Sequence, residues 1–403
     1  MKRRDLLKLA ATAPVSLSFP MIAGSARAAE GDLLLGGIWS VSGYATNVGA
    51  TLNTGCKYAV EALGPSTGRK VDYVMADDRS DPGQSVRQLQ ELIAKRDCKY
   101  FVGSTNSGIA LAVGKEAYAK KVVYSSVGGA DEITGKDCNR YMFRWPASTY
   151  SAIHATLRPM IESMPQAKRW YTITGQYTFG ESLLNNVKAV LKEKGLEHVG
   201  NSYHSLTDRE FSGIVTAAIA AKPDVLVICN FGNQTIDVLR QAVSFGAKSN
   251  MKILLPWSTG LDQMESLGAD IAEGVYFGSN YWHTIDAPTN TVLKDLVKKK
   301  TGAVPTYMEA CGFGAVQLIL EAVKKANSID PKAVITALEG LTYPGVTGEE
   351  HVRAEDHQVI KPYILLRGKA KSAMKDKYDY AEIVSSSKEF LPVTMTGCVM
   401  QPI

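Results

Sequence analysis

Cysteine and histidine are scarce in this chain, with six of each among 403 residues. No two cysteines have the C-x-x-C spacing of zinc or thioredoxin-like sites. The chain also lacks a G-x-S-x-G nucleophile elbow, a P-loop G-x-x-x-x-G-K and the G-x-G-x-x-G dinucleotide motif. These absences disfavour hydrolase, nucleotide and metal chemistry. We therefore expect no enzyme, no cofactor and no metal site.

The chain has no strong net charge of either sign when residues 1–28 are left out. That segment pairs Arg3 with Arg4, continues with a modestly apolar stretch and ends in the small-x-small pattern of Ala26 and Ala28. It has the features of an export signal, either twin-arginine-like or an ordinary secretion signal. Such a signal predicts that the remainder of the chain lies outside the cytoplasm.

Residues 1–28 hold five basic and one acidic side chain of the chain's 45 and 40, which leaves 40 basic and 39 acidic. This near balance gives no reason to expect nucleic acid or an anionic membrane as a partner. No later stretch reaches the 18 apolar residues of a membrane span. The mature chain is therefore expected to be soluble.

Strand-like and helix-like segments alternate along the chain, twice over. At 403 residues and 45% hydrophobic content, the sequence is long enough for two cored domains. The alternation predicts an α/β protein with two Rossmann-like lobes, each built on a parallel sheet with helices on both faces. The expected strands include 33–38, 70–75, 169–174, 225–228 and 253–255.

Loops of small polar residues follow several of these strands directly. GSTNSG (103–108) and SSVGGAD (125–131) come after two apolar runs of the first half, and GQYTFGE (175–181) and NFGNQ (230–234) after two of the second. Ligands of open α/β sheets bind beyond the carboxyl ends of the strands. Hydroxyl groups and exposed N–H groups at such ends favour anion binding, and glycines permit close approach.

Two further features are expected to be structural. The cysteine spacing leaves disulfide connectivity open, with Cys56–Cys98 as one candidate pair. The stretch EEHVRAEDHQ (349–358) resembles a metal site only loosely, because no two of its histidines lie one helical turn apart. We expect it to be a solvated loop.

The order of several short motifs resembles the branched-chain amino acid binding protein family, the type I periplasmic solute receptors of ABC importers. The resemblance covers nearly all of residues 31–370 and rests on motifs that are individually weak but occur in the family's order. They include Val41-Ser42-Gly43, Asp77-Asp78, Asp81-Pro82, the loop from Gly103 to Ser107, Glu132-Ile133-Thr134, Phe143-Arg144, Phe179-Gly180-Glu181, Pro223-Asp224, Leu239-Arg240-Gln241 and Glu273-Gly274-Val275.

The resemblance implies two lobes joined by three hinge strands that close on a small ligand. It implies an N-terminal lobe of residues 31–145 with 276–345 and a C-terminal lobe of residues 146–275 with 346–403. The hinges would then lie near residues 143–148, 274–281 and 342–348. A membrane permease, an ATPase subunit and a small-molecule ligand are the implied partners, and the receptor itself is expected to be a monomer.

The resemblance also implies which residues hold the ligand. The serine that matches Ser107 grips a carboxylate in the family, together with the following loop, which corresponds to Val127, Gly128 and Gly129. Ser107 also fits the N-cap of a helix, which is compatible with that role. Asn106 belongs to the same loop as Ser107.

This sequence departs from the family pattern in the second lobe and at one loop position. Gly129 stands in the place of a threonine, Phe179 and Phe231 in the places of tyrosines, and Trp257 in the place of the acid that holds a ligand ammonium. Burying an ammonium group without a counter-charge is costly. A carboxylate ligand with an aromatic or apolar body is therefore preferred over a branched-chain or other amino acid.

The hypothesis includes two further candidate cleft residues and several alternative functions. Tyr44 is a candidate cleft residue for which core packing is equally compatible, and Tyr307 matches a family position at the cleft rim. A sensor for a membrane signalling partner, a urea or amide receptor of the same fold and, last, an exported hydrolase are the alternatives to a transport receptor.

Overall fold

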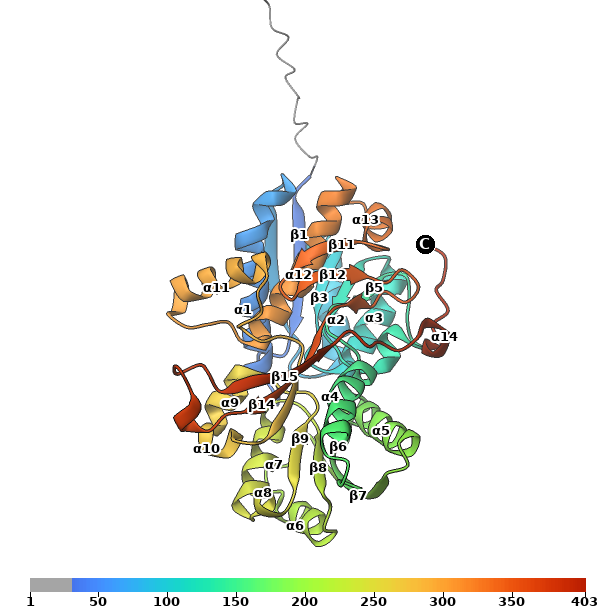
Figure 1. Ribbon diagram of the computed structural model, residues 1–403. Coiled ribbons are helices and arrows are strands. Elements are labelled where there is room, and N and C mark those ends of the chain that lie inside the picture. The colour runs from blue at the N-terminus through green and yellow to red at the C-terminus, as the bar shows by residue number, and fades with distance from the viewer. Residues whose placement is uncertain (1–30) are drawn as a thin grey trace, which may run out of the picture.

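The protein is described by a computed structural model that covers residues 31–403. The predicted export segment 1–28 lies outside the described residues. The described chain forms two lobes, one above the other in the view of Figure 1, each built around its own β-sheet.

The first lobe contains a five-stranded sheet in which all neighbouring strands are parallel. The strand order is β2-β1-β3-β4-β5. Its strands are β1 (Leu33–Trp39), β2 (Val71–Asp77), β3 (Tyr100–Gly103), β4 (Val123–Ser126) and β5 (Met142–Arg144). Six helices belong to this lobe: α1 (Thr46–Leu63), α2 (Pro82–Arg96), α3 (Ser107–Lys120), α11 (Pro288–Thr301), α12 (Tyr307–Ala326) and α13 (Pro331–Leu338).

The N-terminus of helix α2 is capped as the sequence predicts. Asp81 precedes Pro82, and its carboxylate accepts a hydrogen bond of 2.6 Å from the N–H of Gln84. The side chain thus satisfies an N–H group that lacks a partner inside the helix, and proline fits the first helical position.

The second lobe contains a seven-stranded mixed sheet, whereas the alternation predicted a parallel one. The order is β15-β14-β10-β9-β8-β6-β7, and the two strands added at one edge, β14 and β15, are antiparallel to their neighbours. They come from the C-terminal part of the chain, where no helix alternates with them. The strands are β6 (Arg169–Gly175), β7 (Glu197–His204), β8 (Val225–Cys229), β9 (Lys252–Leu255), β10 (Tyr276–Ser279), β14 (Tyr363–Gly368) and β15 (Ala381–Ser387).

Helices cover this second sheet as well (Figure 1). They are α4 (Thr149–Ser163), α5 (Thr178–Glu193), α6 (Ser212–Ala220), α7 (Asn233–Ser244), α8 (Ala247–Asn250), α9 (Leu261–Leu267) and α10 (Ala269–Ala272). No helix within residues 31–403 is long and apolar enough to cross a membrane.

A small third sheet lies on the first lobe beside α11 and α12. It consists of β11 (Thr342–Gly345), β12 (Gly348–Val352) and β13 (Val359–Ile360). The chain therefore passes between the lobes at residues 145–148, 280–287 and 361–362, before its C-terminal segment returns to the first lobe after β15. These three connections follow β5, β10 and β13 respectively.

The stretch 349–358 is not the solvated loop that its charges predicted. Glu350, Asp356 and His357 are at most 1% exposed. Glu350 accepts hydrogen bonds from Trp145 Nε1 and from the hydroxyl of Tyr343. Buried polar groups require such partners, so the charges of this stretch hold the small sheet to the first lobe.

The C-terminal segment returns from the second lobe to the first. After β15 the chain runs to the short helix α14 (Val393–Thr396), which contacts the turn at Asp131–Thr134, and Cys398 forms a disulfide with Cys138. The Cys56–Cys98 pair considered from the sequence is wrong, because both residues are separate, buried free thiols. The Cys56 thiol donates a hydrogen bond to the carbonyl of Gly312 in α12, and the Cys98 thiol donates one to the carbonyl of Tyr100 in β3.

Candidate functional site

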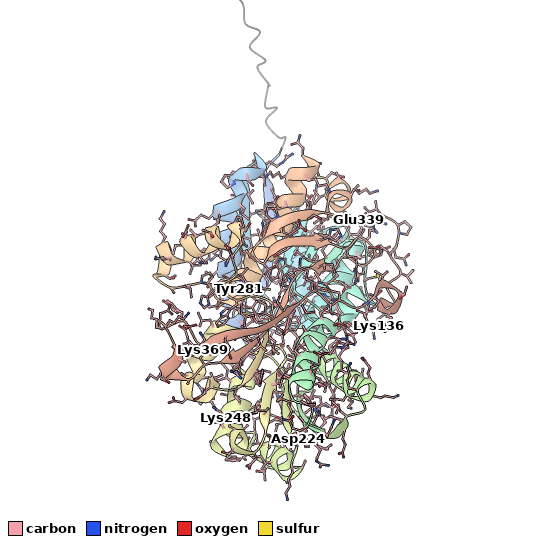
Figure 2. All side chains as sticks on the ribbon, viewed as in Figure 1. Lys136, Asp224, Lys248, Tyr281, Glu339 and Lys369 are labelled. Carbon is pink, nitrogen blue, oxygen red and sulfur yellow. A yellow bond between two sulfur atoms is a disulfide. The ribbon has the colours of Figure 1, made fainter. Side chains whose placement is uncertain are left out.

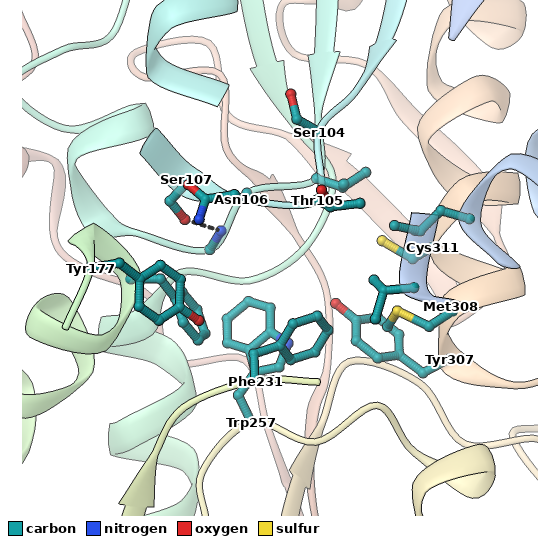
Figure 3. Close-up of a pocket in the computed structure, with 16 residues that line it drawn as sticks. Ser104, Thr105, Asn106, Ser107, Tyr177, Phe231, Trp257, Tyr307, Met308 and Cys311 are labelled. Carbon is teal, nitrogen blue, oxygen red and sulfur yellow. Dashed lines mark hydrogen bonds between the residues drawn. The ribbon is translucent and has the colours of Figure 1, made fainter. Parts of the chain in front are cut away.

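A cavity of about 410 Å³ lies where the two lobes meet. In Figure 3 the polar loop after β3 forms one side and an aromatic wall the other. Nine of the ten residues predicted for the site line it: Asn106, Ser107, Val127, Gly128, Gly129, Phe179, Phe231, Trp257 and Tyr307. The tenth, Tyr44, lines an adjoining cavity of about 400 Å³ instead.

Asn106, rather than Ser107, is the N-cap of α3. Its Oδ1 accepts hydrogen bonds from the N–H groups of Gly108 at 2.7 Å and Ile109 at 3.3 Å. Its Nδ2 donates to the hydroxyl of Tyr44 at 2.8 Å. Because both ends of the amide are occupied, Asn106 shapes the loop and orients Tyr44.

The hydroxyl of Ser107 is oriented by the next loop. Its Oγ accepts hydrogen bonds from the N–H groups of Gly129 and Ala130, both at 3.2 Å. A serine hydroxyl has two acceptor positions and one donor hydrogen. With both acceptor positions taken, Ser107 is left as a donor toward the cavity.

Thr105, on the same loop, presents hydrogen-bond acceptors to the cavity instead of a donor. Ser40 donates its hydrogen to Asp78 at 2.6 Å, so in the 2.5 Å contact between Ser40 and Thr105 the threonine is the donor. Thr105 therefore offers the cavity lone pairs only. Burial raises the pKa of Asp78, whose carboxyl also accepts from Ser80 and Ser85.

Aromatic rings from the second lobe form the opposite wall. Phe179 lies edge-on to Trp257, with ring centroids 5.1 Å apart and an interplanar angle of 85°, and also packs edge-on against Phe231 at 6.2 Å. Such T-shaped pairs are the favoured geometry of aromatic contacts. Phe179 and Trp257 are only 5% and 2% exposed, so most of this wall is shielded from solvent.

The first lobe meets this wall at Gly129. A Cβ added there would lie 2.5 Å from Cε2 of Phe179 and 2.8 Å from the outer ring edge of Trp257. The threonine expected from the family pattern would therefore collide with both rings. Gly129 leaves room for the rings of Phe179 and Trp257, whereas a residue with a Cβ would not.

Tyr177 is a site residue that the sequence interpretation missed. It lies two residues before Phe179, and Figure 3 shows its hydroxyl directed into the cavity. Among residues 31–403 this hydroxyl has no hydrogen-bond partner, and burial raises the pKa of Tyr177 well above its usual value. The second lobe thus supplies a neutral phenol. The sequence did indicate this position in one respect, because Tyr177 belongs to GQYTFGE, the loop at the end of β6.

The third side of the cavity comes from α12. Tyr307, Met308 and Cys311 lie one helical turn apart or less and face the cavity (Figure 3). The hydroxyl of Tyr307 accepts a 3.1 Å hydrogen bond from Nδ2 of Asn280. Burial raises the pKa of the Cys311 thiol to about 12, so this sulfur is a neutral apolar contact.

Charged side chains are absent from the cavity wall of the described protein. Asp262, the acid next along the chain from Trp257, is not on that wall, and burial raises its pKa to about 7. No acid among the described residues therefore lines the cavity beside Trp257. Within residues 31–403 no group of three or more histidine, cysteine or acidic side chains is arranged to hold a metal ion.

Comparisons with known proteins agree on the class of the chain. A family model described as "Periplasmic binding protein" matches residues 33–373. A relative from Brucella abortus (strain 2308), named Leu/Ile/Val-binding protein homolog 4, is 24% identical over 411 residues that cover 97% of this chain and 95% of the relative.

Two solved structures are informative about the fold. An amino acid ABC transporter substrate-binding protein from Pseudomonas fluorescens Pf-5 is 49% identical, has a TM-score of 0.88 and matches 92% of this chain and 100% of its own. A solute-binding protein of an ABC transporter from Rhodopseudomonas palustris BisB5, in complex with 3,4-dihydroxy benzoic acid, is 22% identical with a TM-score of 0.79, and covers 89% of this chain and 97% of its own.

Proposed function

The chain belongs to the periplasmic binding protein family, the solute-binding proteins of ABC transporters, which are not enzymes. From this premise we propose that it captures a small carboxylate-bearing ligand with an aromatic or apolar body. The ligand would bind in the cavity between the lobes and be delivered to a membrane permease with its ATPase subunits. The export signal supports a periplasmic location, and the receptor would act as a monomer.

The hydrogen bonds at Ser107 carry this proposal. A hydroxyl whose lone pairs are both taken by N–H groups needs an acceptor on the ligand, which a carboxylate supplies and an ammonium group does not. The first N–H groups of α3 add positive potential at the same place. The carboxylate end of the ligand would therefore lie against the loop after β3.

The opposite wall supports an aromatic or apolar body. Phe179, Phe231 and Trp257 offer ring faces and edges, and no acid on the wall balances a ligand ammonium. Desolvating an unpaired ammonium costs several kcal/mol. The Rhodopseudomonas palustris protein holds an aromatic acid, whereas the Pseudomonas fluorescens relative is named for amino acids, so an amino acid is the second candidate.

The lobes and hinges are part of the proposal. Strand pairing favours moving two of the boundaries drawn from the sequence: β10 pairs with β9 and β14 of the second sheet, and residues 346–360 lie with β11 on the first lobe. The proposed hinges are accordingly residues 145–148, 280–287 and 361–362. A sensor role would use the same closure with a different membrane partner, and an amide or urea receptor would use the same cleft.

A thermal-shift panel tests the ligand class. Residues 29–403, stripped of ligand by unfolding and oxidative refolding, would be heated with 3,4-dihydroxybenzoate, benzoate, benzamide, leucine or urea. A ligand that binds only the folded state stabilises it by about 2.7 kcal/mol at a hundred times Kd. We expect both benzoates to raise Tm and leucine to leave it unchanged. A strong shift with leucine, benzamide or urea alone would overturn the carboxylate assignment.

Two serine variants sharpen this test. Ser107→Ala removes the donor and should abolish the benzoate shift. Ser126→Ala is the matched control, because Ser126 Oγ also accepts a loop N–H, that of Gly128 at 3.1 Å, but does not line the cavity. An equal loss of binding in both variants would mean that loop structure, not ligand contact, explains the effect.

A further inference from the structure

Asn280 occupies the second connection between the lobes, directly after β10, and is fully buried. Its neighbour Tyr281 lies at the level where the two lobes meet (Figure 2). Three hydrogen bonds leave Asn280 toward three different parts of the chain.

The side chain joins the first connection to the cavity wall. Oδ1 of Asn280 accepts from the N–H of Ala147 at 2.7 Å, and Nδ2 donates to the hydroxyl of Tyr307 at 3.1 Å. Ala147 lies between β5 and α4, whereas Tyr307 begins α12 and lines the cavity. One amide group therefore links a connection between the lobes to a ligand-facing phenol.

The main chain of the same residue joins the third connection. The carbonyl oxygen of Asn280 accepts a 3.0 Å hydrogen bond from Nζ of Lys361, which directly follows β13. This ammonium also lies 4.0 Å from the ring centroid of Trp145, in the first connection. All three connections thus meet at Asn280, in a site where each of these side chains is at most 1% exposed.

We propose that Asn280 is a positioning residue that couples the cavity wall to the connections between the lobes. Its N–H group fills an acceptor position of the Tyr307 hydroxyl, so the phenol hydrogen is directed away from Asn280, toward the thiol of Cys311 and the cavity. Movement of Tyr307 on ligand binding is transmitted to Ala147 and Lys361 through the same residue. The ligand contact of Tyr307 rests on the proposed function; the coupling between the two residues does not.

A distance measurement on the ligand-free protein tests the coupling. Spin labels at cysteines introduced in place of Lys332 on α13 and Lys192 on α5, both exposed, report the separation of the lobes. We expect Asn280→Ala to broaden the distance distribution, Tyr307→Phe to broaden it in the same way, and the double variant to add nothing further. Independent, additive changes would overturn the coupling.

Affinity for 3,4-dihydroxybenzoate is the second readout. Asn280→Ala and Tyr307→Phe should each raise Kd about tenfold, as expected for one lost hydrogen bond to an ionised group, and the double variant should do no more. Asn280→Asp keeps an acceptor for Ala147 but cannot donate to Tyr307, so it should raise Kd equally. If the wild-type protein binds no acid, the proposed function fails while the distance measurement still decides the coupling.

Asn139 provides the matched control. It is also buried, and it accepts from the N–H of Tyr141 at 3.0 Å and donates to the carbonyl of Gly114 at 3.2 Å, so its hydrogen bonds stay within the first lobe and reach no residue of the cavity wall. Asn139→Ala should lower Tm without changing the distance distribution or Kd. If Asn280→Ala behaves in the same way, Asn280 is only structural and the proposal is wrong.

Discussion

Gly129 of the first lobe approaches Phe179 of the second so closely that an added Cβ would lie 2.5 Å from Cε2 of the ring. Observed Cβ atoms do not come this near to other atoms, so one partner must shift. Phe179 is held by Trp257 and Phe231 and is only 5% exposed, which leaves its ring little room. The close approach of the lobes at the cavity therefore depends on glycine at this position.

We expect Gly129→Thr to weaken ligand binding by about five- to a hundredfold. The sequence pattern alone would predict the reverse, because threonine adds a hydroxyl beside Ser107. Overpacking of a buried contact costs typically about 1–3 kcal/mol, and 1.4 kcal/mol is a tenfold change in Kd. Calorimetric titration with 3,4-dihydroxybenzoate measures the loss, and small-angle scattering shows whether the lobes separate.

Gly213 offers a control for the glycine substitution. No heavy atom lies within 4 Å of a Cβ built at this position, which is in α6 and far from the cavity wall. Gly213→Thr should leave Kd unchanged. Truncation of the opposing ring in Gly129→Thr/Phe179→Leu should recover part of the affinity; failure of that rescue together with unaltered scattering would contradict the steric explanation.

Tyr177→Phe tests the hydroxyl in the second lobe. Because this hydroxyl makes no hydrogen bond to residues 31–403, its removal should leave Tm of the ligand-free protein within about 1 °C. Affinity for 3,4-dihydroxybenzoate should fall several-fold, whereas affinity for benzoate, which has no ring hydroxyl, should change less. Equal losses for both acids would place Tyr177 against the carboxylate instead.

The sequence predicted the class of fold and the place of the site better than it predicted the polar details. Strand ends and the motif order led to Ser107, Gly129 and Trp257, because ligand sites of open sheets depend on topology. The role of Gly129 was not predictable, since it depends on a ring from the other lobe. Tyr177 was missed because comparison with the family pattern drew attention to Phe179.

Contacts between residues far apart in the sequence were the other feature that could not be predicted. Cys138 and Cys398 are 260 residues apart, and nothing in the local pattern of either residue indicates the other. The antiparallel edge of the second sheet likewise depends on strands that follow the alternating part of the chain. From the sequence alone, polar side chains such as Glu350 and His357 were expected in solvent, because the partners that bury them could not be predicted.

Removal of the disulfide should destabilise the protein and loosen the return of its C-terminal segment to the first lobe. A crosslink that closes so long a loop contributes typically about 2–5 kcal/mol. Cys138→Ser/Cys398→Ser should therefore lower Tm by several degrees. Reductant should lower Tm of the wild-type protein similarly and leave the double variant unchanged; a wild-type protein insensitive to reductant and to the substitutions would contradict this expectation.

Ion pairs will partly hold that segment even without the disulfide. Glu389, just after β15, accepts from Arg158 at 2.7 Å and contacts His154 Nδ1 at 3.0 Å, both on α4. These contacts fasten the segment to the second lobe only. Proteolysis of the double variant is therefore expected within residues 390–403, with β15 retained, and mass spectrometry of the fragments locates the cut.

Lys361 makes the stability of the fold depend on pH in an unusual direction. Burial lowers the pKa of its ammonium group from 10.5 to about 8. The groups that face it are the carbonyl of Asn280, the ring of Trp145, the carboxylate of Glu350 and the thiol of Cys311. Glu350 and Cys311 raise this pKa in part but do not offset the burial.

We expect Lys361→Met to remove a rise in stability between pH 8 and 10.5. In this window the unfolded chain binds the lysine proton and the folded protein does not, so the free energy of unfolding increases with pH by at most about 1.4 kcal/mol per unit. Below pH 8 both states bind the proton, and the penalty for the buried charge is constant. Urea unfolding at pH 6, 7, 8 and 9.5 measures the difference between wild type and variant, which should be flat from pH 6 to 7 and should shift by about 1–2 kcal/mol in favour of the wild type from pH 8 to 9.5. A difference that stays constant up to pH 9.5 would mean that Lys361 keeps its proton in the folded state, and that its contacts with Asn280 and Trp145 compensate for burial.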